Sequence, residues 1–116
     1  MTFNTTTAKV KKIRDALTAI ETDVPVYHYR KPTDAKLTRY IIWAEDSGNA
    51  FGANNRHEEH AISGTVDLYT QREYDALIDQ IEAALNDTAH IAWSLNAVDY
   101  DDETNLIHYE WMFSVA

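Results

Sequence analysis

The chain has 116 residues with nineteen acidic and ten basic side chains, so its formal net charge is -9 at pH 7, and it contains no cysteine. This length predicts one domain over residues 1–116 with a single hydrophobic core, in which residues 1–6 form a flexible N-terminus. The missing cysteines exclude disulfides, thiolate metal sites and cysteine nucleophiles, and the negative charge disfavours specific binding to nucleic acid or to anionic membranes.

The first predicted element is an amphipathic helix from about Thr7 to Ile20, because apolar residues recur there at helical spacing and basic residues fill the other side. A threonine hydroxyl at position 5, 6 or 7 can cap its first turn. Pro25 prevents its continuation, since the residue before a proline is disfavoured in the helical region. A strand over Val24–Arg30 follows, rich in residues that favour an extended backbone.

The second predicted strand is Tyr40–Glu45, whose run Tyr-Ile-Ile-Trp-Ala suggests burial on both faces. The longest stretch without a periodic pattern follows it, from Asp46 to Arg56, and we predict an irregular loop there. Loops of this length cost conformational entropy and usually serve a function. Phe51 lies in the loop between two glycines and offers an apolar side chain on a flexible segment.

A long third strand is predicted over His57–Tyr69 from alternating apolar and polar residues. Thr70 and Glu73 have the spacing of a capping box, in which each side chain accepts from a backbone donor at the start of a helix. The second helix is therefore predicted over Glu73–Leu85.

Two further strands complete the chain, Ile91–Tyr100, with Val98 offset enough to suggest a bulge, and Leu106–Ala116. The last strand is the clearest pattern, because five large apolar side chains alternate with four others from Ile107 to Val115. The predicted fold class is α+β: a mainly antiparallel sheet of about five strands with two helices on one face, in the order α-β-β-β-α-β-β.

Residues of the types used in catalysis and metal binding do not form a recognised motif. In His57-Glu58-Glu59-His60 the histidines are three apart on a predicted strand, whereas the zinc protease motif needs them four apart on a helix. The acidic turn near Asp101 lacks the spacing and glycine of a calcium-binding EF-hand. We therefore expect no catalytic residue, no metal and no cofactor.

Tyrosine and tryptophan are more numerous than one small core readily buries. Both are favoured at protein interfaces, since they bury area while keeping a polar group hydrated. Many of them will pack in the core, but their number also indicates contact between subunits. The expected contact surface is the irregular loop, through its charged, amide and aromatic side chains: Asp46, Asn49, Phe51, Asn54, Asn55 and Arg56.

Three segments carry a family resemblance: Tyr-Ile-Ile-Trp-Ala-Glu-Asp from Tyr40, Gly-Thr-Val-Asp-Leu-Tyr-Thr from Gly64, and Leu-Ile-His-Tyr-Glu-Trp-Met-Phe from Leu106. Over about Val24–Ala116 the chain resembles the tail terminator, or tail-completion, proteins encoded by siphophages and prophages of Gram-positive bacteria. The resemblance implies an α/β subunit of a ring, commonly a hexamer, that caps the tail tube and performs no covalent chemistry.

The resemblance also implies partners and a location. The partners would be further copies of the chain, the tail tube protein and the head connector, with DNA passing unbound through the ring. The protein would be made in the host cytoplasm, since the threonine-rich N-terminus is unlike a signal peptide, and would end in the tail or neck of the virion. Two alternatives remain: a head-completion or stopper protein of the neck, and a small acidic α+β enzyme or metal- or ligand-binding domain that uses His57–His60.

Overall fold

The computed structural model describes residues 5–50 and 60–116. The chain folds into seven elements: α1 (Thr6–Thr18), β1 (Val26–His28), β2 (Arg39–Ala50), β3 (His60–Thr70), α2 (Ala76–Asp87), β4 (Ile91–Asp101) and β5 (Leu106–Val115). This order and the α+β class confirm the prediction from the sequence. Among the described residues, no helix is both long enough and apolar enough to cross a membrane.

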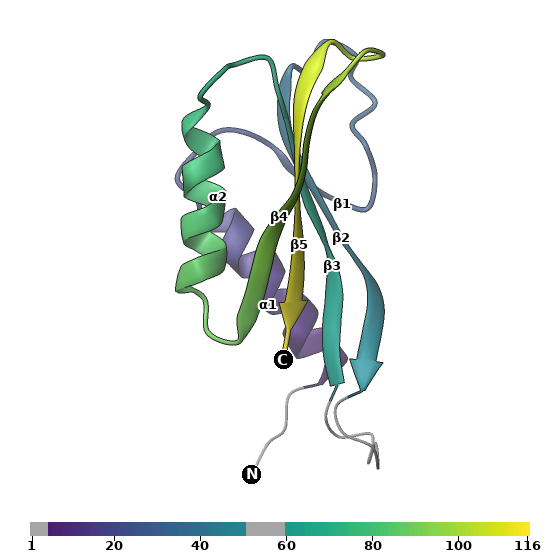
Figure 1. Cartoon of the computed structure of the whole chain (residues 1–116), viewed down its shortest axis with the longest axis vertical. Helices are drawn as coiled ribbons and strands as arrows, with labels where there is room; N and C mark the ends of the chain where they lie inside the picture. Colours follow the sequence, from purple (N-terminus) through teal and green to yellow (C-terminus); the bar gives the residue numbers. More distant parts are fainter. Residues whose placement is uncertain (1–4, 51–59) are drawn as a thin grey trace.

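The strands form one sheet in the order β1-β2-β3-β5-β4, in which only β1 and β2 are parallel. Both helices pack on the same face of this sheet, with α1 drawn in purple and α2 in green in Figure 1. β2 ends and β3 begins at one end of the sheet, and the β4–β5 turn lies at the other (Figure 1). The outermost strands are β1 and β4, so the two edges of the sheet are formed by very different lengths of strand.

The helix-covered face holds the main core. Trp111 of β5 is fully buried there, beside Val66 and Leu68 of β3. Each helix adds apolar side chains at helical spacing, and every one of these is fully buried: Ile13, Leu17, Leu77, Ile81 and Leu85. The alternation predicted for the last strand is confirmed, because Trp111, Phe113 and Val115 are all buried. Burial of this apolar surface is the main source of stability.

The helix-free face is formed by the alternate residues of the same strands, among them Tyr40, Asp67, Tyr69, His108 and Glu110. One end of it is covered by the connection between β1 and β2, because parallel neighbours need a crossover. Leu37 of this connection packs there against a second, small apolar cluster.

The structure corrects several predictions of where elements begin, end or bulge. The first strand, expected over Val24–Arg30, is only Val26–His28. The irregular loop expected from Asp46 is strand as far as Ala50, because residues of low strand propensity are held by pairing with β3, as in Asn49 opposite Ala61. Asp46 lies where the register shifts, between Glu45 and Ser47. The bulge in β4 occurs between Leu95 and Ala97, so the extra residue is Asn96 and not Val98.

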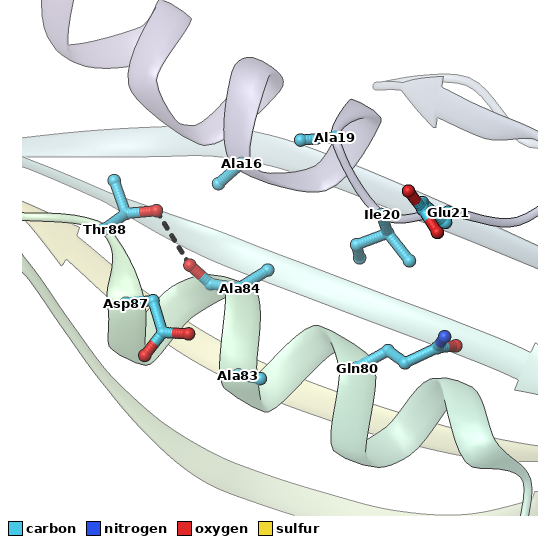
Figure 2. A pocket seen from close by; sticks show the side chains of 9 residues that line it. All are labelled: Ala16, Ala19, Ile20, Glu21, Gln80, Ala83, Ala84, Asp87 and Thr88. Carbon is cyan, nitrogen blue, oxygen red and sulfur yellow. Dashed lines mark hydrogen bonds between the residues drawn. The ribbon is translucent and has the colours of Figure 1, made fainter.

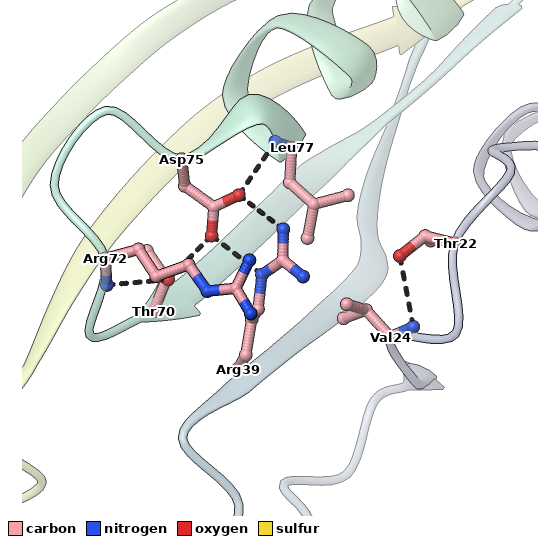
Figure 3. Close-up of polar contacts among 7 residues, drawn as sticks. All are labelled: Thr22, Val24, Arg39, Thr70, Arg72, Asp75 and Leu77. Atoms are coloured by element: carbon pink, nitrogen blue, oxygen red, sulfur yellow. Dashed lines mark hydrogen bonds and ion pairs between the residues drawn. The ribbon is translucent and has the colours of Figure 1, made fainter.

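Helix α2 begins at Ala76, three residues after the predicted start. Its N-cap is Asp75, whose buried carboxylate accepts from the backbone N–H of Leu77 at 2.9 Å. Figure 3 shows the same carboxylate held by the Arg39 guanidinium at 2.6 and 2.8 Å and by the Thr70 hydroxyl at 2.7 Å. A buried, arginine-paired aspartate therefore caps the helix in place of the predicted Thr70–Glu73 box.

Candidate functional site

The residues predicted to form the interface are divided by the structure. Asp46 and Asn49 belong to β2, and Asp46 is exposed at the bulge of that strand. Phe51, Asn54, Asn55 and Arg56 lie outside the described residues, as do His57, Glu58 and Glu59 of the candidate metal-ligand segment.

His60, the last residue of that segment, is the first residue of β3. Its Nε2 lies 3.1 Å from the Thr6 hydroxyl, and its carbonyl accepts from the Lys9 ammonium, which is buried. Both contacts join the start of β3 to α1. His60 therefore helps to place the first helix on the sheet.

A shallow groove of about 330 Å³ separates the C-terminal halves of the two helices. Ala16 and Ile20 extend toward α2 across it (Figure 2). The Thr88 hydroxyl at its end is already bonded to the Ala84 carbonyl at 2.8 Å. The groove is lined mainly by small side chains, so it offers a contact surface without converging reactive groups.

A second cleft, of about 290 Å³, lies between α1 and the first two strands. Its basic side is formed by Lys11 and Arg14 of α1, and its far side by His28, Trp43 and Glu45. The Glu45 carboxylate accepts from the Tyr29 hydroxyl and lies 2.7 Å from His28 Nε2. Burial acts to raise the pKa of Glu45, but hydrogen bonds, chiefly those with Tyr29 and His28, contribute to a net lowering of that pKa. A carboxylate held in its charged form is a weak proton acceptor, so this cluster is suited to fixing the edge of the sheet.

The Tyr29 backbone explains how that cluster forms. Neighbours on a strand point to opposite faces, but Tyr29 has a φ of 73°, and Arg30 N–H donates to the His28 carbonyl at 2.9 Å. This tight turn brings the Tyr29 ring onto His28, with 3.9 Å between ring centroids, and His28 in turn stacks on Trp43 at 3.8 Å. A bulky residue with positive φ is strained, and its hydrogen bond and stacking hold it there.

On the helix-free face, four rings form a continuous series across the sheet. Tyr27 meets Tyr40 edge-on at 6.4 Å, Tyr40 stacks on Tyr69 at 5.1 Å, and Tyr69 stacks on His108 at 4.5 Å. Burial, followed by the charge of Asp67, raises the pKa of Tyr69 to about 12. The phenol therefore stays neutral under physiological conditions.

His108 ends this series among carboxylates. Its Nε2 lies 2.6 Å from Asp67 Oδ1, and its Nδ1 lies 3.3 Å from Asp99 Oδ1. Glu110 is directly opposite Asp67 across the β3–β5 pair. Burial raises the pKa of Asp67, although the hydrogen bond to His108 opposes the increase. No pattern in the sequence indicates this cluster, because its members come from three strands that are paired only in the fold.

The two edges of the sheet differ in character. The β4 edge exposes Leu95, Val98 and Tyr100, each close to half accessible to solvent, and it leads into an acidic turn. The other edge is formed by the short β1 and, beyond it, by the part of β2 that β1 does not pair with, beside Lys11 and Arg14 of α1. The β4 edge thus leads into acidic side chains, whereas Lys11 and Arg14 of α1 lie near the β1 edge.

No protein-family model matches the chain, and a search of curated proteins finds no match either. The described residues contain hydrogen-bonded carboxylate clusters, two open clefts and a long exposed edge strand. Neither cleft brings a nucleophile beside a free base among the residues that line it.

Proposed function

We propose that this chain is a non-enzymatic subunit of a ring, commonly a hexamer, that terminates the tail tube of a siphophage or prophage. The observation that carries the proposal is the difference between the two edges of the sheet. A ring is built from heterologous contacts, in which one surface of a subunit meets a different surface of the next. A chain with two unlike and complementary sides fits that requirement.

The β4 edge supplies one of the two surfaces. It is eleven residues long, and Leu95, Val98 and Tyr100 are 47, 51 and 57% exposed along it. A long edge strand with apolar side chains pairs readily with other chains unless it is covered. The adjoining turn adds the exposed acids Asp102 and Glu103. In the proposed ring, the next subunit covers this edge.

The opposite side supplies the complementary surface. Lys11 and Arg14 are exposed on the part of α1 that faces β1 and β2, where they line the 290 Å³ cleft. Opposite charges on the two surfaces favour the head-to-tail pairing and disfavour pairing of like edges. Association is then steered by charge and held by the apolar contacts of β4.

The ends of the sheet are left for the other partners. Strand β2 carries Asp46 and Asn49 toward one end, and the β4–β5 turn lies at the other (Figure 1). We assign the end of the sheet where β2 ends and β3 begins to docking on the tube protein or the head connector. The predicted interface residues Phe51, Asn54, Asn55 and Arg56 lie outside the described residues and belong to the same proposed contact. DNA would pass through a ring whose subunits are acidic and do not bind phosphate specifically.

Electron microscopy of tails assembled without this protein tests the proposal. We expect tubes longer than the normal tail, because polymerisation lacks its stop, and normal lengths when the protein is added back. Tails of normal length that fail to join heads would contradict termination and would indicate the head-completion or stopper role.

Charge reversal tests the head-to-tail contact directly. The double variants Lys11→Glu with Arg14→Glu, and Asp102→Lys with Glu103→Lys, should each fold but fail to form caps on purified tubes. The variant with all four changes should cap tubes again, because both surfaces are reversed together. Lys36→Glu, at an exposed position in the β1–β2 connection, is the matched control and should cap normally. Failure of the fourfold variant, with unchanged circular dichroism, would contradict this contact.

A further inference from the structure

Three metal-ligating side chains converge on the helix-free face. Asp67 of β3 and Glu110 of β5 are directly opposite one another, and His108 is two residues before Glu110 and therefore on the same face. One ligand atom from each of the three lies within 4.8 Å of the others. Asp67 and His108 are partly buried, with 17 and 15% of their side chains exposed. The donors are thus fixed by the register of the central strands.

Two further residues orient these donors. Asp99 Oδ1 lies 3.3 Å from His108 Nδ1, and a proton on Nδ1 leaves the lone pair of Nε2 available on the side of Asp67. Asn96 Nδ2 donates to Glu110 Oε1 at 2.6 Å, and Asn96 is the extra residue of the bulge in β4. Metal ligands are commonly held by such outer hydrogen bonds, above all by a carboxylate on the second ring nitrogen of a histidine.

In the part of the chain that the structure describes, the negative charges at this position are not balanced by positively charged side chains. Within residues 5–50 and 60–116, none of Asp67, Asp99 and Glu110 forms an ion pair with a lysine or arginine. Like charges directly opposite one another on paired strands are destabilising. A single imidazole, even when protonated, balances only one of the three carboxylates. By contrast, the Asp75 carboxylate is balanced by an ion pair with the Arg39 guanidinium.

We propose that Asp67, His108 and Glu110 bind a divalent transition-metal ion of the Zn²⁺ type. One imidazole nitrogen and two carboxylate oxygens, with water in the fourth position, form a common zinc ligand set, whereas Mg²⁺ and Ca²⁺ prefer oxygen alone. Tetrahedral zinc holds neighbouring ligand atoms about 3.3 Å apart, so the 2.6 Å contact between Asp67 and His108 opens by less than about 1 Å. The ion links β3 to β5, and the site is independent of the proposed ring.

The test is metal binding by the purified full chain. After removal of metal and dialysis against Zn²⁺, elemental analysis should find one zinc per chain. Zn²⁺ should also raise the melting temperature by about 5 °C or more, because a ligand that binds only the folded state stabilises it, while Mg²⁺ should not. Asp67→Asn and Glu110→Gln keep the side-chain shapes and should each lose the zinc and the shift. Glu73→Gln, an exposed acid that precedes α2, is the matched control and should keep both.

The remaining outcomes overturn the inference. Full zinc binding by folded Glu110→Gln protein would show that the ion is held elsewhere. Loss of zinc on changing both His57 and His60 to Ala, with retention in the Asp67 and Glu110 variants, would assign the metal to the His57–His60 segment. Absence of zinc from the unchanged chain would mean that Asp67 and Asp99 serve only as hydrogen-bond partners of His108.

Discussion

The two faces of the sheet are made from alternate residues of the same strands, yet they are stabilised in different ways. The helix-covered face is a continuous apolar core around Trp111. The helix-free face is a series of rings that ends at His108 among acidic side chains. The first depends on the volume and burial of its side chains, and the second depends on specific pairs between strands. Substitutions on the two faces should therefore have effects of very different size.

Neighbouring residues on β5 give the largest contrast. Trp111 is fully buried on the helix-covered face, and Trp111→Ala should lower the free energy of unfolding by about 4 kcal/mol through lost burial and an internal cavity. Met112 is 47% exposed on the other face, and Met112→Ala should cost about 0.5 kcal/mol. Urea denaturation measures both. Equal losses would contradict the assignment of these residues to unlike faces.

The addition of even one methyl group on the helix-covered face should also lower the free energy of unfolding. A Cβ on Gly64 would overlap the Ala44 carbonyl oxygen and lie 2.7 Å from both Glu45 Cα and Phe113 Cζ. Because two of these atoms are backbone, β2 must move, and Gly64→Ala should cost about 3 kcal/mol. Gly48→Ala is the control, since the nearest atoms would be 3.7 Å away, and it should stay within about 0.5 kcal/mol of wild type.

The helix-covered face was predictable from the sequence because burial repeats along each element. The alternation from Ile107 to Val115 and the helical spacing of Ile13 and Leu17 both indicate the elements and their buried sides. The order of elements followed from the same periodicity. Boundaries set by distant contacts did not, as at Asp46–Ala50 of β2, where pairing with β3 continues the strand through residues typical of loops.

The contribution of Asp75, a carboxylate on the helix-covered side, to the free energy of unfolding should change with pH in the opposite direction to that of Asp67 on the helix-free face. Burial acts to raise the pKa of Asp75, but hydrogen bonds from Arg39, Leu77 N–H and Thr70 hold it at about 2. A pKa below the unfolded value means that the stabilisation is present above about pH 4 and is lost as the pH falls toward 2. The expected loss is about 2 kcal/mol, from the difference between the folded and unfolded pKa.

Denaturation of wild type and Asp75→Asn between pH 5 and 2 checks this value. The variant should be less stable at pH 5, and the difference between the two proteins should shrink as Asp75 becomes protonated. Asp67→Asn is the counterpart on the helix-free face, because burial raises the pKa of Asp67 and its contribution has the opposite sign, falling as the pH increases. A constant difference between wild type and Asp75→Asn across this range would contradict the lowered pKa.

The candidate sites were much less predictable than the core. His28 meets Glu45 through the parallel pairing of β1 with β2, and Tyr29 joins them through its positive φ. Neither feature has a periodic signal in the sequence. Asp67 and His108 are 41 positions apart, and their contact depends on the β3–β5 register. The sequence indicated a candidate site only among adjacent residues, as in His57–His60, because a sequence shows local spacing but not which strands pair.

The last prediction concerns Glu110→Gln on the helix-free face. This change should raise the free energy of unfolding, whereas every change proposed on the helix-covered face lowers it. In buffer free of metal at pH 7, Glu110→Gln removes one of two charges that lie directly opposite one another, while its amide oxygen can still accept from Asn96. The free energy of unfolding should rise by about 0.5 kcal/mol, and the gain should shrink in high salt, where the repulsion is screened. Urea denaturation at low and high salt measures it.

With Zn²⁺ present the order of stability should reverse, because only the wild-type chain gains from the ion. A loss of stability without metal would mean that Glu110 stabilises the cluster through His108, and the case for an unbalanced negative charge at this position would fail.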